Sequence, residues 1–420
     1  MGLVIQKFGG TSVASAQHIR AAAAVVAAAQ ARGHKPVVVV SAMGAETDRL
    51  AGLAAQVAAA PSRRELDMLL SSGEQASVAL MAMALREAGC EARSFLGSQV
   101  RILTDSVFSK AHIREVETSR LQSYIDSGGV PVVAGFQGVD AEGEITTFGR
   151  GGSDTTAVAL AAALNADECQ ILTDVDGIYT TDPRVVPEAR RLSRITFEEI
   201  IELASQGSRV LQIRAVKFAG KYNVPLRVLH MSGVGEGTLI SFEEPGVEAP
   251  VVSGIAFTRD EAEITIVGVR NQPGAAAAIL KPVSDARIQV DMIVMNAPRG
   301  GCVDFSFSVD RADYPQAMEL ARQAAASLGA EDVLGNDAVA KLSVVGVGMR
   351  AHAGIASHVF ETLAAESINV RMVSTSEIKI SVLVADKDID AAVRSLHRAF
   401  ELDQPSGRWS DSAKVDKTAH

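Results

Sequence analysis

Residues Lys7 to Ser12, with the sequence KFGGTS, combine groups that bind anions. They follow the apolar run Leu3–Ile5, which predicts a strand. The two glycines let backbone N–H groups approach an anion closely, and the lysine adds a positive charge. A Walker loop places its lysine after the glycines, and the dinucleotide fingerprint needs three spaced glycines. We therefore expect a phosphate site of another kind, with Thr11 and Ser12 capping the next helix; the alternative is a tight turn with a surface lysine.

A second glycine-rich stretch surrounds an arginine. Residues 146–156 read TTFGRGGSDTT, so Arg150 lies among three glycines. Ser153 and Asp154 follow at the expected N-terminal cap of an alanine-rich helix. Arginine binds a carboxylate or a phosphate through two parallel hydrogen bonds, and a glycine-rich turn costs backbone entropy. We interpret Arg150 as a ligand-binding residue, and the alternative is an exposed arginine ahead of a capped helix.

Two further stretches contain acidic residues with more than one interpretation. Residues 173–184 read TDVDGIYTTDPR, whose aspartate spacing is faintly like that of a calcium loop. The glutamate of the twelfth place is missing, with Arg184 after Pro183 instead, so calcium binding is not expected. Glu74, in the sequence SSGEQ of residues 71–75, stands near the start of an apolar helix, where an acidic side chain is usually an N-terminal cap.

Strands and helices alternate in the first half of the chain and would position these groups. Apolar runs predict strands at residues 3–5, 36–40, 93–96, 130–134 and 170–173. Helices are expected near residues 15–32, 64–88, 112–127, 153–165 and 196–206. Strands that are apolar throughout are buried on both faces, which predicts an α/β sandwich with a mostly parallel sheet. Such sheets bind ligands at the carboxyl ends of their strands, where residues 7–12 and 41–44 both lie.

The second half contains an internal repeat behind a glycine-rich linker at residues 232–250. Residues 264–269, ITIVGV, match residues 342–347, LSVVGV. Each run is followed by a helix that begins at a glycine, Gly274 or Gly354, and then by two strands and a second helix. This order predicts two ferredoxin-like units of about 75 residues each. A polar tail is expected at residues 406–420.

Composition limits the classes of protein that fit. The 420 residues carry a formal net charge of −10 and no cluster of Lys and Arg, so binding to nucleic acid is not expected. The three cysteines are far apart, which predicts neither a disulfide framework nor a zinc site and favours the cytoplasm. No signal peptide is visible. The longest small-apolar stretch, residues 21–31, is shorter than the about 20 residues that cross a membrane, so no membrane association is expected.

Together these stretches resemble the aspartate kinases, a branch of the amino-acid kinase family. The matching segments lie in the family's order, at residues 7–13, 40–44, 72–74, 149–154 and 173–184. The two C-terminal repeats are similar to the paired ACT regulatory modules of that family. The resemblance implies a three-layer amino-acid kinase fold (α/β, mostly parallel sheet) over residues 1–245. Two ferredoxin-like ACT domains would follow, at residues 251–335 and 336–405.

The resemblance also implies a reaction and its residues. ATP would phosphorylate the side-chain carboxylate of L-aspartate to give 4-phospho-L-aspartate, the first step toward lysine, threonine and methionine. That carboxylate is already ionised at pH 7, so no general base is needed. Catalysis then rests on positioning and charge neutralisation, by Lys7, Asp154 and a Mg²⁺ ion held mainly by the phosphates rather than by protein side chains. The implied nucleotide-binding residues are Lys7, Phe8, Gly9, Gly10, Ser41, Thr173, Asp174, Tyr179, Asp182 and Arg184. The implied aspartate-binding residues are Thr47, Glu74 (α-ammonium), Arg150 (α-carboxylate) and Ser153.

Regulation is expected at the two repeats, with lysine and threonine as feedback inhibitors and a homo-oligomer formed through the ACT domains. The candidate effector-binding residues are Gln272, Gly274, Asp291, Met292, Asn296, Ser374 and Glu377. The alternative is that the repeats only dimerise the protein. An acetylglutamate or glutamate kinase would share the fold but does not normally combine the KFGGTS opening with paired repeats. A non-catalytic amino-acid sensor is disfavoured because Lys7, Glu74, Arg150 and Asp154 are intact.

Overall fold

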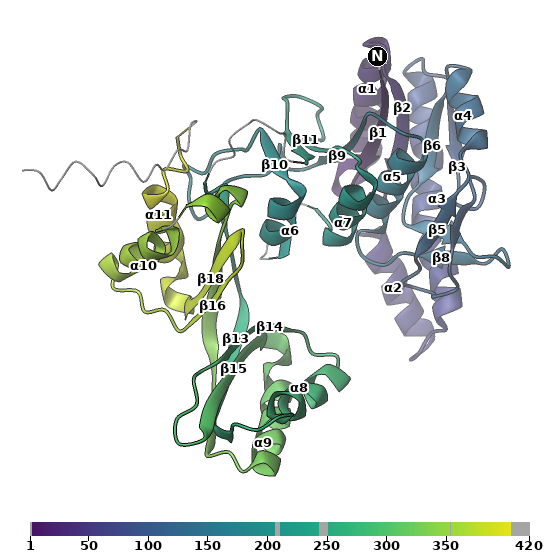
Figure 1. The fold of residues 1–420 in the computed structure, drawn as a ribbon. Helices are drawn as coiled ribbons and strands as arrows, with labels where there is room; N and C mark the ends of the chain where they lie inside the picture. The colour runs from purple at the N-terminus through teal and green to yellow at the C-terminus, as the bar shows by residue number, and fades with distance from the viewer. Residues whose placement is uncertain (1, 206–210, 243–250, 353, 405–420) are drawn as a thin grey trace, which may run out of the picture. The chain divides into compact units, whose positions relative to one another are not determined.

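The computed structural model describes residues 2–205, 211–242, 251–352 and 354–404 (Figure 1). The chain divides into two compact units. The first unit comprises Met1–Ile178, Arg191–Ala204 and Arg209–Pro245. The second comprises Tyr179–Arg190, Ser205–Ser208 and Gly246–His420. The predicted polar tail and much of the predicted linker lie outside the described residues.

Within the described residues, the first unit contains an eight-stranded sheet in the order β10-β12-β11-β9-β1-β2-β6-β3. Neighbouring strands run parallel except for β11 and β12. The strands are β1 (Leu3–Phe8), β2 (Lys35–Val40), β3 (Ala92–Phe95), β6 (Val130–Ala134), β9 (Glu168–Thr173), β10 (Arg194–Thr196), β11 (Leu226–His230) and β12 (Thr238–Ser241). The four consecutive valines of β2 are fully buried, as β-branched side chains in a central parallel strand should be.

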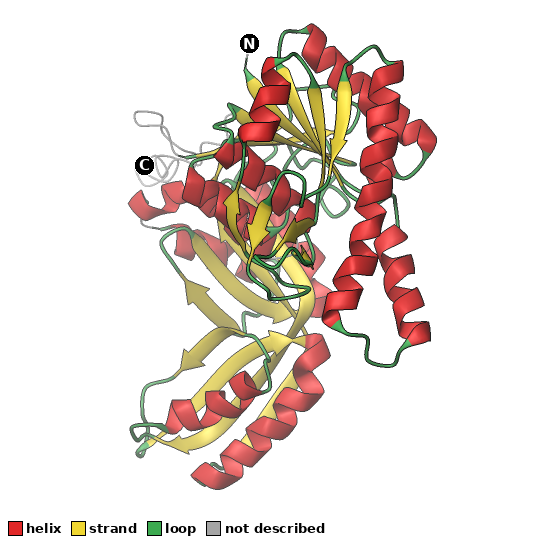
Figure 2. Cartoon of the chain, turned by 90° about the vertical axis from the view of Figure 1, so that its right-hand side faces the viewer, coloured by secondary structure: helices red, strands yellow, loops and turns green. Residues whose placement is uncertain are grey.

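Helices flank both faces of this sheet and give three layers (Figure 2). On one side, α1 (Ala16–Ala31) packs against α3 (Arg63–Glu87), and on the other α5 (Gly152–Ala163) packs against α7 (Ile213–Tyr222). The remaining helices of the unit are α2 (Glu46–Val57), α4 (Ser119–Asp126) and α6 (Phe197–Ser205). The predicted α/β sandwich with a mostly parallel sheet is confirmed.

A small second sheet lies at one end of α3 and was not foreseen in the sequence. Its order is β5-β4-β7-β8, and its strands are β4 (Ile102–Thr104), β5 (Ile113–Val116), β7 (Gln137–Val139) and β8 (Ile145–Thr147). The turn from β7 to β8 is held by Asp140, whose Oδ1 accepts hydrogen bonds from the N–H groups of Glu142 (3.0 Å) and Glu144 (2.9 Å). The predicted helix at residues 112–127 is wrong in its first half, because residues 113–116 pair with β4.

The three predicted N-terminal caps are wrong as well. A 3₁₀ turn, Thr11–Val13, precedes α1, so the cap is Ser15, whose side chain accepts from the N–H of His18. The cap residue of α5 is Gly151 at φ 69°, a left-handed conformation that glycine adopts without strain, and Ser153 and Asp154 lie in the first turn. Glu74 lies in the middle of α3.

The second unit contains a six-stranded antiparallel sheet among its described residues, in the order β14-β15-β13-β16-β18-β17. Its strands are β13 (Gly254–Arg270), β14 (Val290–Met295), β15 (Cys302–Asp310), β16 (Asp332–Val345), β17 (Met372–Thr375) and β18 (Lys379–Ala385). Its helices are α8 (Ala275–Asp285), α9 (Tyr314–Leu328), α10 (Ile355–Ala365) and α11 (Ile389–Ala399). Gly274 and Gly354 cap α8 and α10 in left-handed conformations, with φ 92° and φ 101°.

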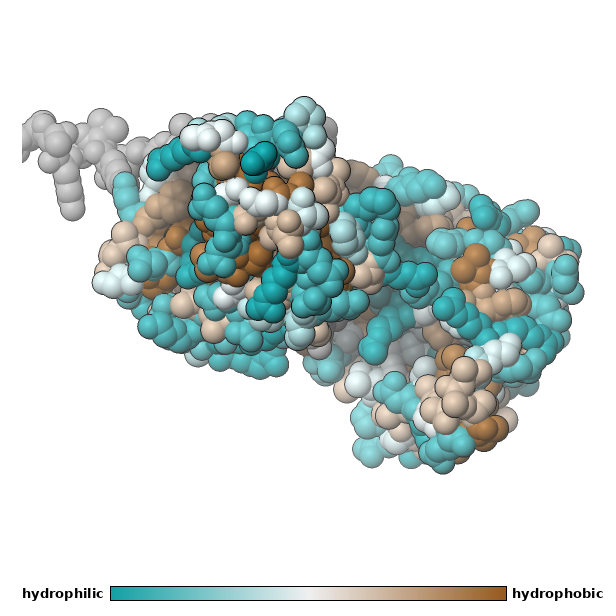
Figure 3. All heavy atoms as spheres, turned by 90° about the horizontal axis from the view of Figure 1, so that it is seen from below, coloured by the Kyte–Doolittle hydropathy of each residue, from teal (hydrophilic) through white to brown (hydrophobic). Residues whose placement is uncertain are grey.

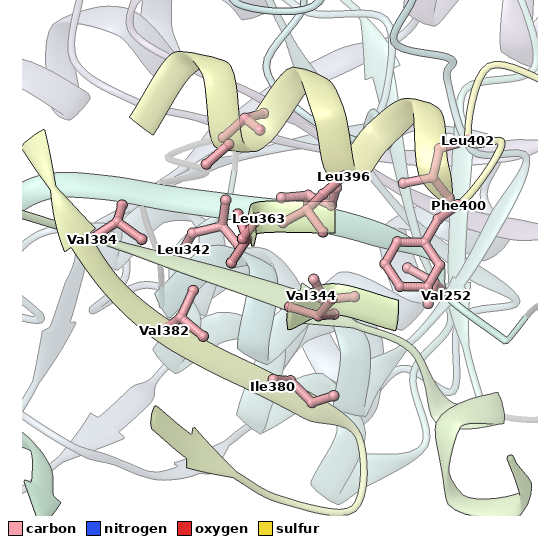
Figure 4. Packing of buried hydrophobic residues seen from close by; sticks show 14 of the residues in the cluster. Val252, Leu342, Val344, Leu363, Ile380, Val382, Val384, Leu396, Phe400 and Leu402 are labelled. Atoms are coloured by element: carbon pink, nitrogen blue, oxygen red, sulfur yellow. The ribbon is translucent and has the colours of Figure 1, made fainter. Parts of the chain in front are cut away.

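Two large hydrophobic cores and a smaller third one lie among the described residues of this unit, and the long strands β13 and β16 contribute to both large cores. The first core packs the second half of β13 against α8 and α9. The second packs β18, α10 and α11 against the end of β16 and the start of β13 (Figure 4). Residues 254–258 of β13 pair with residues 341–345 of β16, whereas residues 263–267 pair with 332–336. The first part of β13 therefore belongs to the sheet of the second repeat, and the first part of β16 belongs to the sheet of the first repeat.

Two ion pairs join the repeats, and in both of them the first repeat supplies the acidic residue and the second repeat the basic one. In the sequence match of the repeats, Glu263 corresponds to Lys341 and Asp291 corresponds to Arg371. Glu263 Oε2 accepts from Arg371 Nε at 2.6 Å, and the buried Lys341 ammonium binds Asp291. Lys341 also contacts Glu261 Oε1 at 2.7 Å. Equivalent positions thus carry reversed charges in the two repeats.

The surface carries apolar side chains only in places. Hydrophilic residues cover most of the face seen in Figure 3, with apolar patches between them. Exposed large apolar residues of the second unit include Ile293 and Met295 on β14 and Val373 on β17. Among the described helices, α3 alone is long and apolar enough to span a membrane, and half of its most apolar window is buried within the protein, as in a core helix.

Candidate active site

The first glycine-rich loop lies at the carboxyl end of β1 and joins the start of α5 through an ion pair. Lys7 Nζ lies 2.6 Å from Asp154 Oδ1, and both side chains are almost buried. Asp154 is in the first turn of α5, where the helix dipole favours a negative group. The pair brings together the two residues predicted to carry catalysis.

The loops after β1 and β2 pack directly on one another. The N–H of Ser41 donates to Phe8 O at 3.1 Å, and the N–H of Gly44 donates to Gly10 O at 3.0 Å. A Cβ atom on Gly10 would lie only 3.0 Å from Ala42 O, so a larger residue would push the loops apart. The Phe8 ring is fully buried, which leaves only its backbone for a ligand.

Glu74 reaches this edge from the middle of α3 because that helix approaches the loop after β2 at Gly73. A Cβ atom on Gly73 would lie 2.9 Å from Ala42 Cβ. Glu74 is 2% exposed, and its Oε1 accepts a hydrogen bond from the N–H of Ala42 at 3.0 Å. Its Oε2 has no hydrogen-bond partner among the described residues. Burial raises the pKa of Glu74 to about 7, although the Ala42 hydrogen bond opposes the shift.

Arg150 lies in a loop whose backbone is bent by two glycines. Gly149 and Gly151 have φ 74° and 69°, both left-handed. The carbonyl of Arg150 accepts from Gln212 Nε2 at 2.9 Å. The guanidinium of Arg150 is exposed, and no ion pair joins it to another described residue. The loop therefore presents a cation that the rest of the described first unit does not neutralise.

The other predicted substrate and nucleotide residues fall in two places. Ser153 is buried beside Gly135, and Thr47 is half-buried in the first turn of α2. Thr173 ends β9, and its Oγ1 donates to Asp174 Oδ1 at 3.0 Å. The last group belongs to the second unit and comprises Tyr179, Asp182 and Arg184. There Asp182 binds Arg184 at 2.7 Å, which lowers the pKa of the Asp182 carboxyl.

The predicted effector residues lie around both ends of the six-stranded sheet. Asp291 is engaged by Lys341, and Met292 is buried. Asn296 exchanges two hydrogen bonds with Asp304, at 3.0 and 2.8 Å. Three more lie at or beside strand ends with partial or full exposure, namely Gln272, Ser374 and Glu377. The positions of these residues do not by themselves define a single cavity.

Sequence reasoning missed two residues that hold the site's loops. Asp67 on α3 is completely buried and accepts four hydrogen bonds, and Arg214 on α7 donates to Phe148 O at 2.9 Å and Ala111 O at 2.7 Å. No local pattern marks either residue, because their partners come from a small sheet and its loops, which the sequence did not reveal. Among the described residues, no group of three or more His, Cys, Asp or Glu side chains is arranged to hold a metal ion.

Comparisons with known proteins agree with this fold. The profile of the Amino acid kinase family matches residues 2–230, and that of the ACT domain matches residues 342–400. An aspartokinase of Pseudomonas aeruginosa is 58% identical over 97% of this chain and 99% of its own length. E. coli aspartokinase III, solved with aspartate and ADP, has a TM-score of 0.77 at 27% identity and covers 95% of this chain and 100% of that one. Its structure with lysine and aspartate has a TM-score of 0.76 at 27% identity, over 94% and 99%.

The chain therefore belongs to the amino acid kinase family. Its identity to the Pseudomonas enzyme over nearly the whole length places it, within that family, among the aspartate kinases.

Proposed function

We propose that the protein transfers the terminal phosphoryl group of ATP to the side-chain carboxylate of L-aspartate. The observation that carries this proposal is the buried Glu74 carboxylate, whose Oε2 accepts a hydrogen bond from none of the described residues. A buried carboxylate oxygen without a donor is costly, and an ammonium group satisfies it. The aspartate and ADP bound to the related E. coli enzyme support the same assignment.

The two charges of the amino acid would be recognised at separate places. Glu74 takes the α-ammonium, and the unneutralised Arg150 takes the α-carboxylate through paired hydrogen bonds. Thr47 and Ser153 act as neutral hydrogen-bond partners. The side-chain carboxylate remains as the nucleophile, already ionised, so the reaction needs no general base.

The phosphates would lie at the loops after β1 and β2. Lys7 supplies the positive charge there, and Asp154 holds the lysine at 2.6 Å. The donors at this edge, N–H groups, hydroxyls and one ammonium, suit phosphate oxygens better than a divalent cation. This fits a Mg²⁺ ion carried by the phosphates, where it would neutralise their charge. The base and ribose are assigned to Thr173 and Asp174 at the end of β9. The nucleotide roles that the resemblance implies for Tyr179, Asp182 and Arg184 stay predictions.

The direct test is product trapping. The purified protein with ATP, Mg²⁺ and L-aspartate in hydroxylamine should yield aspartyl hydroxamate, because an acyl phosphate reacts with that nucleophile. L-Glutamate and N-acetylglutamate serve as control substrates and should give little product. If ATP is not consumed with L-aspartate, or if N-acetylglutamate is preferred, the proposed substrate is wrong.

We further propose that both repeats are ACT modules and that lysine and threonine inhibit the enzyme through them. The ACT profile matches the second repeat, and the first has the same order of elements. The lysine in the E. coli structure supports lysine as an effector. Asp291 and Glu377 are the proposed ammonium ligands. Since Asp291 is bound to Lys341, an effector at Asp291 would compete with that ion pair.

The expected result is inhibition by lysine and by threonine, stronger when both are present. A coupling free energy of about 1–3 kcal/mol between effector and substrate corresponds to 5- to 150-fold effects. Steady-state rates with each amino acid, alone and together, measure it. Indifference to both at millimolar concentration would exclude the regulatory proposal. A normal response in Asp291→Ala would instead show that this residue is misassigned.

The assembly and the compartment are also proposals. The exposed apolar residues Ile293 and Met295 lie on β14, and Val373 lies on β17, the two outer strands of the second unit's sheet. Apolar side chains exposed on these strands favour contact with another copy, which supports a homo-oligomer through the ACT modules. The cysteines Cys90, Cys169 and Cys302 are unpaired, which supports a reducing, cytoplasmic setting.

A further inference from the structure

Hydrogen bonds to its backbone hold the loop that carries Arg150. Thr147 O accepts from the N–H of Ala111 at 2.9 Å, and the N–H of Phe148 donates to Phe136 O at 3.0 Å. Arg214 binds Phe148 O, and Gln212 binds Arg150 O. The guanidinium of Arg150 makes no ion pair with a described residue. A rigid backbone that presents an unneutralised side chain is what preorganised ligand binding requires.

Asp67 fixes the start of this loop from α3. Its Oδ2 accepts from the N–H groups of Ser109 and Thr147, both at 2.8 Å. Its Oδ1 accepts from the hydroxyls of the same two residues, at 3.0 and 2.8 Å. Asp67 is 0% exposed, and its two hydrogen bonds with Thr147 are buried, whereas those with Ser109 are partly buried. A fully buried carboxylate is expensive unless such donors surround it, so this arrangement admits little movement.

Ser109, which Asp67 holds, packs against Gly149, the residue before Arg150. Ser109 adopts a left-handed conformation with φ 69°, which is uncommon for a serine, and Asp67 binds both its N–H and its hydroxyl. A Cβ atom on Gly149 would lie 3.1 Å from Ser109 O, so the two backbones are in close contact. Asp67 therefore acts on the Arg150 loop in two ways. It binds Thr147 directly, and it binds Ser109, which packs against Gly149.

Asp67 and Glu74 lie on the same helix, seven residues apart. Residues at this spacing are two turns apart on one face of a helix. Glu74 is the proposed ligand of the α-ammonium, and Asp67 holds the loop of Arg150, the proposed ligand of the α-carboxylate. We propose that Asp67 is a positioning residue that fixes the separation of Glu74 and Arg150, and that it thereby sets the fit of the amino-acid substrate. This inference rests on the proposed function.

The test compares KM values for the two substrates in Asp67→Asn. The amide keeps the size of the carboxylate, and the Ser109 and Thr147 hydroxyls can turn to accept from it, so the fold is expected to persist. The loop loses its charge-assisted hydrogen bonds, and we expect the KM for L-aspartate to rise roughly 10- to 100-fold, as for small displacements of positioned groups. The KM for ATP should stay within about twofold, because the phosphate loops do not contact Asp67. The preference for L-aspartate over L-glutamate should fall.

Thr147→Val provides a second, milder variant, since it removes one hydroxyl from Asp67 and suits a strand. It should shift the KM for L-aspartate in the same direction, and it keeps the test open if Asp67→Asn does not fold. Asp140→Asn is the matched control: Asp140 is also buried and also accepts backbone N–H groups in the small sheet, but at the far turn. It should lower the melting temperature without changing the KM for L-aspartate.

The outcomes separate this inference from the proposed function. If wild-type protein forms no aspartyl hydroxamate, the proposed substrate is wrong and Asp67 positions the loop for something else. If wild-type protein forms it and both folded variants keep a normal KM for L-aspartate, Asp67 is only a structural residue. An equal rise in both KM values, or the same rise in Asp140→Asn, would also overturn the positioning role.

Discussion

Replacing Lys7 with alanine is expected to reduce turnover by roughly 10²-fold or more, on the scale of removing one preorganised electrostatic contact. Lys7 Nζ is bound to Asp154 at 2.6 Å, and its side chain is only 12% exposed, so its charge acts with little screening by water. The substitution removes the cation that would face the phosphates and leaves Asp154 without its partner. Steady-state turnover at saturating ATP and L-aspartate measures the loss.

Lys35 provides a matched control for this experiment. It stands at the start of β2, in register with Leu3 and thus at the opposite edge of the sheet from Lys7. Its side chain is 58% exposed and faces Asp126 at 3.6 Å. Lys35→Ala should keep normal turnover, because exposed pairs of this kind contribute little. Near-native turnover in folded Lys7→Ala would show that the loop does not act on the phosphates.

Arg150→Ala and Glu74→Ala are expected to impair use of L-aspartate much more than binding of ATP. Each variant leaves one charged end of the substrate without its partner. For the buried Glu74 the cost is about 2–5 kcal/mol, and for the exposed Arg150 it is smaller because water screens the charge. The ratio of kcat/KM for L-aspartate between wild type and variant gives this cost, and a nucleotide titration gives the ATP affinity. An equal loss of ATP affinity would show that both residues are misassigned.

Substrate analogues and pH distinguish the two ends. Succinate lacks the amino group, so the preference for L-aspartate over succinate should be smaller in Glu74→Ala than in the wild type. β-Alanine lacks the α-carboxylate, so the preference for L-aspartate over β-alanine should be smaller in Arg150→Ala. The pKa of Glu74 is raised to about 7 by burial, so the carboxylate becomes neutral as the pH falls through 7. The KM for L-aspartate should therefore rise below pH 7 in the wild type. In Glu74→Gln this dependence should disappear.

The sequence predicts the layers of the first unit well because its strands are apolar throughout. The β-branched run Val37 to Val40 favours a central strand, and the alanine-rich run Ala16–Ala31 favours a helix that packs closely, as the structure shows. The predictions of the helix caps are wrong for a physical reason. A 3₁₀ turn precedes α1 and a left-handed glycine precedes α5, and neither feature changes the local composition. The family resemblance implies a substrate role for Glu74, whereas its burial in the middle of α3 follows only from the fold.

The small sheet shows what the sequence could not reveal. Its strands are three or four residues long, too short for a periodic pattern. Asp67 depends on that sheet, because its four donors come from residues 42 and 80 positions away in the chain. The stretch 179–190 is a similar case. It continues a predicted nucleotide motif, yet Thr180 bonds to His397 of α11 at 3.0 Å inside the second unit.

The reversed ion pairs between the repeats bear on how this pair of repeats diverged from one another. If two copies of the first repeat met in this arrangement, Glu263 would face Asp291, and two copies of the second would set Lys341 against Arg371. Both combinations oppose like charges, and the buried position of Lys341 would make that repulsion severe. After a duplication, the present charges would therefore penalise the symmetric combinations. The charges of each repeat therefore favour pairing with the other repeat and disfavour pairing with a second copy of the same repeat.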